Sequence, residues 1–243
     1  MNICFVADYF ADEIPGGGEL NNEEFINIVK SRGHNVKKIK SINAGPKYLE
    51  SLINYKFIVA NFIQLSESSK EFLLDKTYVI YEHDHKYLKS RNPANYENFL
   101  APKSEIINYN FYKSAKATFC QSAFHVDIIK SNLHLNNIYN LSGNLWANKT
   151  LDLIQSLLTN KKENVCAIMH STIAHKNTSE AIRYCNIKEL KYKLILPSSH
   201  HIFLQEMSRY DKFIFFPKTP ETLSRVVVEA RMLGLKTINN QLI

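Results

Sequence analysis

The sequence predicts an α/β protein with parallel sheets, because short apolar runs alternate with longer amphipathic stretches along the whole chain. The runs are rich in β-branched and aromatic residues, and the stretches between them repeat apolar residues at helical spacing. The expected strands are residues 3–7, 35–39, 57–60, 78–81 and 117–120, and then 165–169, 193–196, 213–216 and 236–238. Helices are expected between them, including residues 179–184 and 223–233.

The alternation stops and restarts around residues 140–146, where Asn, Ser and Gly suit a turn. We therefore expect two Rossmann-like domains, residues 1–143 and residues 144–243, that face each other and bind a ligand at the carboxyl ends of their strands. A single long doubly wound sheet is the alternative.

Composition narrows the class of protein. The chain has 243 residues, of which 45% are hydrophobic and 22% charged, so it is expected to fold into a globular protein. No apolar run is long enough to cross a bilayer, and Asp8 interrupts the first apolar segment, so the expected location is the cytoplasm, or the host cytoplasm if the gene is viral. The four cysteines are widely spaced without a CxxC pair, and no metal site is expected.

The charge is uneven. The net charge of +7 is made up of +1 over residues 1–143 and +6 over residues 144–243. Such an excess favours an anionic partner, such as a nucleotide, a nucleic acid or an anionic lipid surface. Ordinary solubility charge is the alternative.

Three glycines and an acidic residue follow the first strand, Gly16-Gly17-Gly18-Glu19, and a helix is expected to begin near Gly18. Glycines bring backbone amides close to a bound group, and a helix N-terminus favours negative charge, so this segment suits an anion or sugar cradle. The segment is neither GxGxxG nor a Walker loop. A plain flexible turn has the same composition.

Two glutamates stand eight positions apart near the end of the chain. Glu221 is expected at the start of a helix, with Glu229 two turns further along nearly the same face. Glu229 interrupts an apolar run, where a carboxylate needs a partner. Ribose or sugar hydroxyls fit that requirement, and so does an internal ion pair with Arg225 or Arg231.

A cluster of ionisable residues follows the fourth strand. Glu82, His83, Asp84 and His85 lie at a strand's carboxyl end, where they suit hydrogen bonding to an acceptor or proton transfer. Basic and aromatic residues then interleave over residues 86–116, a pattern typical of phosphate-backbone contacts and equally of an ordinary half-buried helix surface.

These motifs carry a resemblance to a known family. Glu221 and Glu229 resemble the paired-glutamate motif of family-4-type retaining glycosyltransferases, which have the GT-B architecture. Residues 16–19 are similar to that family's amino-terminal GG-x-E segment, and residues 33–36 resemble its GH-x-V continuation. Residues 175–177 resemble its phosphate-binding loop, with Asn177 in place of the usual Gly and Ser171 in place of an arginine. Residues 81–91 are also similar to small glycosyltransferases of tailed phages.

The resemblance implies a glycosyltransferase that moves a sugar from a nucleoside diphosphate sugar, a UDP-sugar, to an acceptor hydroxyl, with retention and without a metal or cofactor. The donor-binding residues it implies are Gly17, Gly18, Lys176, Thr222, Leu223, Ser224 and Glu229. The catalytic candidates are His83, Asp84, His85 and Glu221, and the acceptor-binding candidates are Glu19, Lys86 and Arg91. If the reaction inverts configuration, Asp84 is the candidate base, with Glu19 or Asp8 behind it.

The acceptor is expected to be a polyanion, and hydroxymethylated phage DNA with its target base flipped fits the basic charge. A lipid-linked or surface glycan is an alternative acceptor, and a non-catalytic nucleotide-binding or nucleic-acid-binding protein is an alternative class. The sequence carries no prediction of oligomeric state. Glu229→Ala and Lys176→Ala are expected to abolish turnover and to leave the melting temperature within a few degrees.

Overall fold

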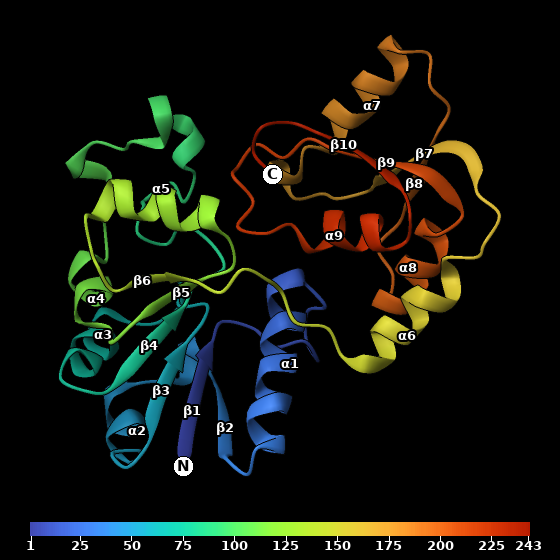
Figure 1. Ribbon diagram of the computed structural model, residues 1–243. Coiled ribbons are helices and arrows are strands. Elements are labelled where there is room, and N and C mark those ends of the chain that lie inside the picture. Colours follow the sequence, from blue (N-terminus) through green and yellow to red (C-terminus); the bar gives the residue numbers. More distant parts are fainter. The chain divides into compact units, whose positions relative to one another are not determined.

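The structure is a computed structural model that describes residues 1–243. The chain divides into two compact units, Met1–Leu145 and Trp146–Ile243 (Figure 1). The boundary between them falls after Leu145, whereas the sequence placed it after residue 143. Each unit contains its own parallel sheet, so the alternative of one long sheet is wrong.

The first unit is built on a six-stranded parallel sheet in the order β2-β1-β3-β4-β5-β6. Its strands are β1 (Asn2–Ala7), β2 (Asn35–Lys40), β3 (Lys56–Val59), β4 (Tyr78–Tyr81), β5 (Thr118–Cys120) and β6 (Ile138–Asn140). β6 was not predicted, because it is three residues long and only Ile138 is buried, which leaves no apolar run to recognise.

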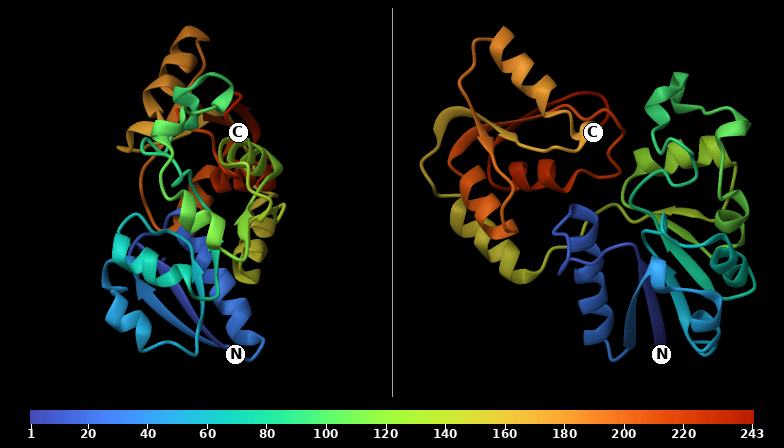
Figure 2. Two further views of the ribbon diagram at one scale, coloured as in Figure 1. Left: turned by 90° about the vertical axis from the view of Figure 1, so that its left-hand side faces the viewer. Right: turned by 180° about the vertical axis from the view of Figure 1, so that it is seen from behind.

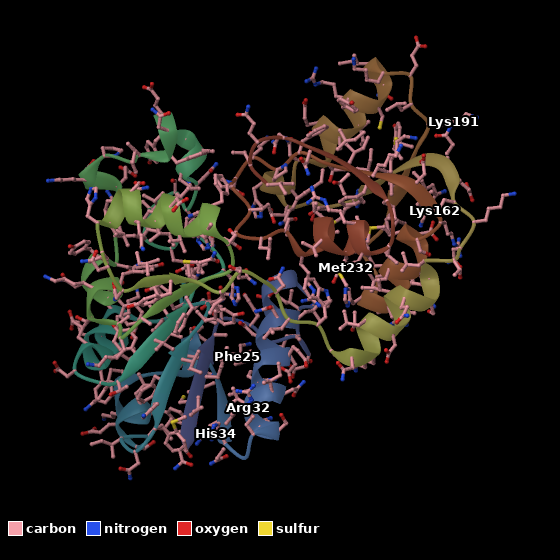
Figure 3. All side chains as sticks on the ribbon, in the orientation of Figure 1. Phe25, Arg32, His34, Lys162, Lys191 and Met232 are labelled. Carbon is pink, nitrogen blue, oxygen red and sulfur yellow. The ribbon has the colours of Figure 1, made fainter.

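Helices cover the first sheet, as Figure 2 shows from two further sides. They are α1 (Gly17–Ser31), α2 (Pro46–Glu50), α3 (Glu67–Leu74), α4 (Tyr109–Ser114) and α5 (Ala123–Leu133), with 3₁₀ turns at Ser41–Asn43, Pro93–Asn95, Glu97–Phe99 and Lys103–Glu105. The helix α1 packs on the sheet through Phe25 (labelled in Figure 3), whose ring centroid lies 6.2 Å from that of Phe5 and 5.4 Å from that of Tyr81. Aromatic edge contacts of this kind hold the middle of α1 beside β1 and β4.

The second unit has a four-stranded parallel sheet in the order β10-β9-β7-β8. Its elements are α6 (Asn148–Leu157), β7 (Glu163–Met169), a 3₁₀ turn at Ala174–Lys176, α7 (Thr178–Ile187), β8 (Tyr192–Ile195), α8 (His200–Met207), β9 (Tyr210–Phe215), α9 (Arg225–Met232) and β10 (Lys236–Asn239). Successive residues of β7 point to opposite faces: Ala167 packs in a cluster with residues of α6, α8 and α9, whereas Cys166 and Ile168 pack with residues of α7. Helices therefore cover both faces of this sheet.

The parallel arrangement determines where polar side chains gather. In each sheet the carboxyl ends of all strands lie at one edge, so the segments that follow β1, β4 and β5 meet in the first unit. The segments that follow β7 and β9 meet in the second unit in the same way. None of the helices combines the length and the apolar character that a membrane span requires.

Candidate functional site

Lys176 and Glu221 come together at the carboxyl edge of the second sheet. Lys176 ends the 3₁₀ turn after β7, Glu221 lies in the loop after β9, and its Oε1 is 2.8 Å from the lysine Nζ. The two loops are also joined through the backbone, since the Lys218 N–H donates to the His175 carbonyl over 2.9 Å. The predicted phosphate-binding lysine and the first glutamate of the motif are therefore direct neighbours.

Glu221 does not start a helix. The helix α9 begins at Arg225, and residues 221–224 form a loop, so the prediction that both glutamates share one helix face is wrong. The cause is the chain's last segment: the Glu221 N–H donates to the Leu242 carbonyl over 2.8 Å, and the Asn240 side chain donates to the Pro217 carbonyl over 2.8 Å. These bonds hold the loop in a turn and delay the helix by one turn.

Glu229 lies within α9 and is 2% exposed. Its Oε1 accepts hydrogen bonds from Arg225 Nε and Trp146 Nε1, each over 2.9 Å, and lies 2.9 Å from His200 Nε2. Of the two arginines considered from the sequence, Arg225 is the partner because it stands one helical turn earlier on the same face. Arg231 is exposed and donates to Thr237 instead. The carboxylate is thus held by an internal ion pair.

The N-terminus of α9 offers a place for an anion. Ser224 occupies the N-cap position, directly after Thr222 and Leu223, but its side chain caps nothing. The residue is 3% exposed, and its Oγ has no hydrogen-bond partner. Buried hydroxyls are normally satisfied, and a helix N-terminus favours negative charge. A phosphate oxygen at this point would satisfy the hydroxyl and the helix end together.

In the first unit, Glu19 folds back onto the start of α1. A Cβ on Gly16 would lie 2.3 Å from Glu19 Oε2, so glycine at this position leaves room for the carboxylate. Burial raises the pKa of Glu19 against the opposing effects of a hydrogen bond from its own backbone N–H and of the charge of Lys86. Gly17 begins the helix. Gly18 lies beside His83, since a Cβ added to Gly18 would be 3.6 Å from the Cβ of His83. The glycine segment and the histidine cluster therefore meet at this edge.

His83 is held on both sides by amide side chains. Its Nε2 lies 2.6 Å from Asn22 Oδ1, its Nδ1 lies 3.3 Å from Gln121 Oε1, and its ring centroid is 4.5 Å from that of Tyr81. Burial, helped by the charge of Lys86, lowers the pKa of His83 to about 3, so the imidazole is neutral at pH 7. Asn22 and Gln121 were not predicted, although Gln121 directly follows β5 at the same edge.

Glu82 supports the loop after β4 from the protein interior. It is fully buried and accepts hydrogen bonds from the Asp84 N–H over 2.8 Å, from Lys86 Nζ over 2.5 Å and from the Tyr112 hydroxyl. Burial raises the pKa of Glu82, and the pairing with Lys86 opposes that effect. Lys86 is itself 2% exposed, which corrects the expectation that it faces an acceptor.

Asp84 and Arg91, predicted for catalysis and for acceptor binding, pair with each other. Arg91 Nη1 lies 3.0 Å from Asp84 Oδ2, and the arginine remains exposed. Burial alone would raise the pKa of Asp84, but the charges of Lys86, His85 and Arg91 outweigh it, and the pKa is lowered. His85 is buried against His125, whose Nε2 lies 3.0 Å from the Asp84 carbonyl. His85 therefore lies behind the loop and not at its surface.

Asp8, the last candidate for the base, binds backbone N–H groups of a neighbouring loop. It is 4% exposed and accepts hydrogen bonds from the N–H groups of Ile63 and Gln64 over 2.9 and 3.0 Å. Those bonds tie the loop after β3 to the end of β1. No group of three or more His, Cys, Asp or Glu side chains lies so as to hold a metal ion.

The basic excess of the second unit lies away from these residues. Several of its lysines and arginines stand at or just before the amino ends of the four strands, at the opposite edge of the sheet: Lys161, Lys162, Lys188, Lys191, Lys193, Arg209, Lys212 and Lys236. Lys162 and Lys191 are labelled in Figure 3. A hollow of about 650 Å³ at this edge is lined by Lys191, Lys193 and Arg209 together with Glu163 and Glu206. The charge of the second unit is therefore not concentrated at the candidate donor residues.

Comparison with solved structures places the fold. The α/β chain with its two parallel sheets matches structures of GT-B glycosyltransferases. The HepE protein of Anabaena in complex with UDP-glucose is 14% identical, with a TM-score of 0.60 over 99% of this chain and 80% of that one. The T4 α-glucosyltransferase in complex with UDP and a 13-mer DNA containing an HMU base is 12% identical, with a TM-score of 0.56 over 98% of this chain and 79% of that one.

The same fold occurs in an enzyme of another class. A UDP-GlcNAc 2-epimerase of Methanocaldococcus jannaschii, in complex with UDP-GlcNAc and UDP, is 13% identical, with a TM-score of 0.56 over 98% of this chain and 83% of that one. No protein-family model and no curated protein sequence matches this chain. The three structures have the fold and a bound uridine nucleotide in common, and at these identities the likeness shows the fold alone.

Proposed function

We propose that this protein is a glycosyltransferase that transfers a sugar from a UDP-sugar to an acceptor hydroxyl. The observation that carries the proposal is the unpartnered, buried hydroxyl of Ser224 at the N-terminus of α9, on the sheet edge that also holds Lys176 and Glu221. A diphosphate fits this combination of a free hydroxyl, a helix N-terminus and a lysine. The uridine nucleotides bound by the three similar structures support the choice of nucleotide.

Each donor-binding residue contacts a different part of the UDP-sugar. Ser224 and the backbone of Thr222 and Leu223 receive the diphosphate, and Lys176 neutralises the charge that develops on the leaving UDP. Glu229 binds the ribose hydroxyls, and Glu221 binds the sugar once Lys176 turns to the phosphate. In the first unit, Gly17 and Gly18 supply backbone contacts at the start of α1.

Retention of configuration is part of the proposal. The bond between the anomeric carbon and the β-phosphate oxygen breaks, a bond to the acceptor oxygen forms on the same face, and the acceptor proton leaves on a phosphate oxygen of UDP. The lowered pKa of His83, about 3, makes it a poor base for proton removal. For it to bind the sugar, a sugar hydroxyl would take the place of Asn22 or Gln121 at one ring nitrogen. Were the reaction inverting, Glu19 is the better base, because its pKa is raised and that of Asp84 is lowered.

The acceptor that we propose is a polyanion, hydroxymethylated DNA, supported by the similar structure that has DNA bound. The net charge of +7 favours an anionic partner in general, although much of it lies away from the candidate donor residues. Glu19 and Arg91 are the remaining acceptor-side residues, and Lys86 is reassigned to support the loop. Release of UDP from a panel of UDP-sugars, measured with plain DNA, hydroxymethylated DNA and lipid-linked glycan, tests both steps. Transfer to the glycan alone would show that the acceptor is a glycan and not DNA. If the protein binds UDP but releases no UDP from any UDP-sugar with any acceptor, it is a nucleotide-binding protein and the proposed enzyme activity is refuted.

A further inference from the structure

Trp146 is the only tryptophan of the chain, and it is tied to the candidate ribose-binding residue. Its indole N–H donates to Glu229 Oε1 over 2.9 Å, and the guanidinium of Arg225 lies over its ring, 4.7 Å from the centroid. Both the edge and the face of the indole are therefore held by the same buried ion pair. Trp146 itself is half-buried.

Three donors crowd one oxygen atom of Glu229. Arg225 Nε, Trp146 Nε1 and His200 Nε2 all lie 2.9 Å from Oε1. A carboxylate oxygen offers about two lone-pair directions, so Oε1 has no room for a further hydroxyl. A ribose hydroxyl that binds Oε1, the oxygen that faces Trp146, must replace one of the three donors.

Trp146 is the donor that can leave at least cost. Arg225 and Glu229 sit on the same helix and are 9% and 2% exposed, so their separation would strand a buried charge. His200 belongs to the first turn of α8. Trp146 lies outside any helix, before the start of α6 at Asn148, so its ring can turn without breaking secondary structure.

The chain before Trp146 is anchored, which confines the movement to the side chain. The Leu145 N–H donates to Asn21 Oδ1 over 2.7 Å, and Asn144 Oδ1 accepts a hydrogen bond from Gln121. We propose that Trp146 is a clasp on Glu229 that the ribose of the donor displaces. This inference rests on the proposed function and adds Trp146 to the donor site as a positioning residue.

The emission of this single tryptophan tests the inference in the unmodified protein. UDP is titrated while Trp146 emission and its quenching by acrylamide are recorded, and the dissociation constant is measured separately by calorimetry. We expect the emission to change with the calorimetric dissociation constant, and quenching to increase as the indole leaves the carboxylate. Pyrophosphate, which has no ribose, should bind more weakly and leave the emission unchanged.

The variant Trp146→Phe keeps a smaller aromatic ring beside Arg225 and removes the competing indole N–H. It should bind UDP about three- to tenfold more tightly, because the competent state of Glu229 no longer has to be released by the indole. Its melting temperature shows whether it folds. The clasp would be overturned if UDP binds the wild-type protein without changing its emission and binds Trp146→Phe with the same dissociation constant. The proposed function would then stay intact. An equal emission change with pyrophosphate would also overturn it, and absence of any UDP binding would remove both proposals.

Discussion

Lys176 and Glu221 form an ion pair of 2.8 Å although they belong to loops that follow two different strands. Both side chains are partly exposed, at 26% and 14%, so the pair contributes little to stability, about 0–1 kcal/mol. In the proposed function the pair holds Lys176 and Glu221 ready at the sheet edge. When the donor binds, Lys176 turns to the diphosphate and Glu221 binds the sugar.

Lys176→Ala should therefore abolish turnover without unfolding the protein. We expect UDP affinity to fall by at least about tenfold, since a charge-assisted contact to phosphate is lost, and the free energy of unfolding to change by less than about 1 kcal/mol. Calorimetry with UDP and urea unfolding measure the two effects. Lys188→Ala, an exposed lysine after α7, is the matched control and should change neither. Unchanged turnover in Lys176→Ala would contradict the donor-site assignment.

Glu229→Ala should destabilise the protein, which reverses the expectation drawn from the sequence. Removal of the carboxylate leaves Arg225 buried without its partner, and such a loss typically costs about 3–5 kcal/mol. Glu229→Gln keeps an acceptor at the same place and should cost less, while still weakening ribose binding. Urea unfolding compares the two variants with Arg231→Ala, an exposed arginine two residues further along the same helix. A melting temperature of Glu229→Ala equal to that of the wild type would refute the internal ion pair.

The sequence predicted the positions of nine of the ten strands, because most of them carry β-branched or aromatic residues at buried positions. It also showed that Glu229 needed a partner. What it could not show was where α9 begins, because the start depends on a hydrogen bond between backbone groups far apart in the sequence, from the Glu221 N–H to the Leu242 carbonyl. The amide partners of His83 were missed for the same reason: Asn22 and Gln121 are 61 and 38 residues away along the chain.

Stability should fall as the pH is lowered below neutrality, because the folded chain holds the half-buried His83 and the fully buried His125 in the neutral form. The pKa of His83 is lowered from 6.5 to about 3, chiefly by burial, and that of His125 is lowered well below its usual value for the same cause. Below pH 6.5 the unfolded chain takes up protons that the folded chain does not, so the free energy of unfolding decreases. At pH 5, His83 alone should cost about 2 kcal/mol relative to pH 8.

Urea unfolding at pH 8, 6.5, 5 and 4 measures this slope, and the same series on His83→Gln isolates the histidine. Glu82 works in the opposite direction, because its raised pKa lets the folded state hold a proton more readily, and only the difference between the two proteins is decisive. The wild type should lose more stability than His83→Gln between pH 6.5 and pH 4. Parallel curves would show that the pKa of His83 is the same in the folded and the unfolded protein, against the lowered value.

Tyr112→Phe should weaken the support of the loop that follows β4. The Tyr112 hydroxyl donates to Glu82, which also accepts from the Asp84 N–H, so its removal leaves a buried carboxylate with one donor fewer. A hydrogen bond to a buried charged group is worth about 1.5–3 kcal/mol, and urea unfolding should show a loss of that size. Tyr109→Phe is the matched control, because Tyr109 lies on the same helix and is 40% exposed, and its loss should stay within about 0.5 kcal/mol. If the loop positions His83 for the proposed transfer, Tyr112→Phe also lowers kcat with little change in the KM for the donor, whereas equal stability of the two variants would show that Tyr112 does not support Glu82.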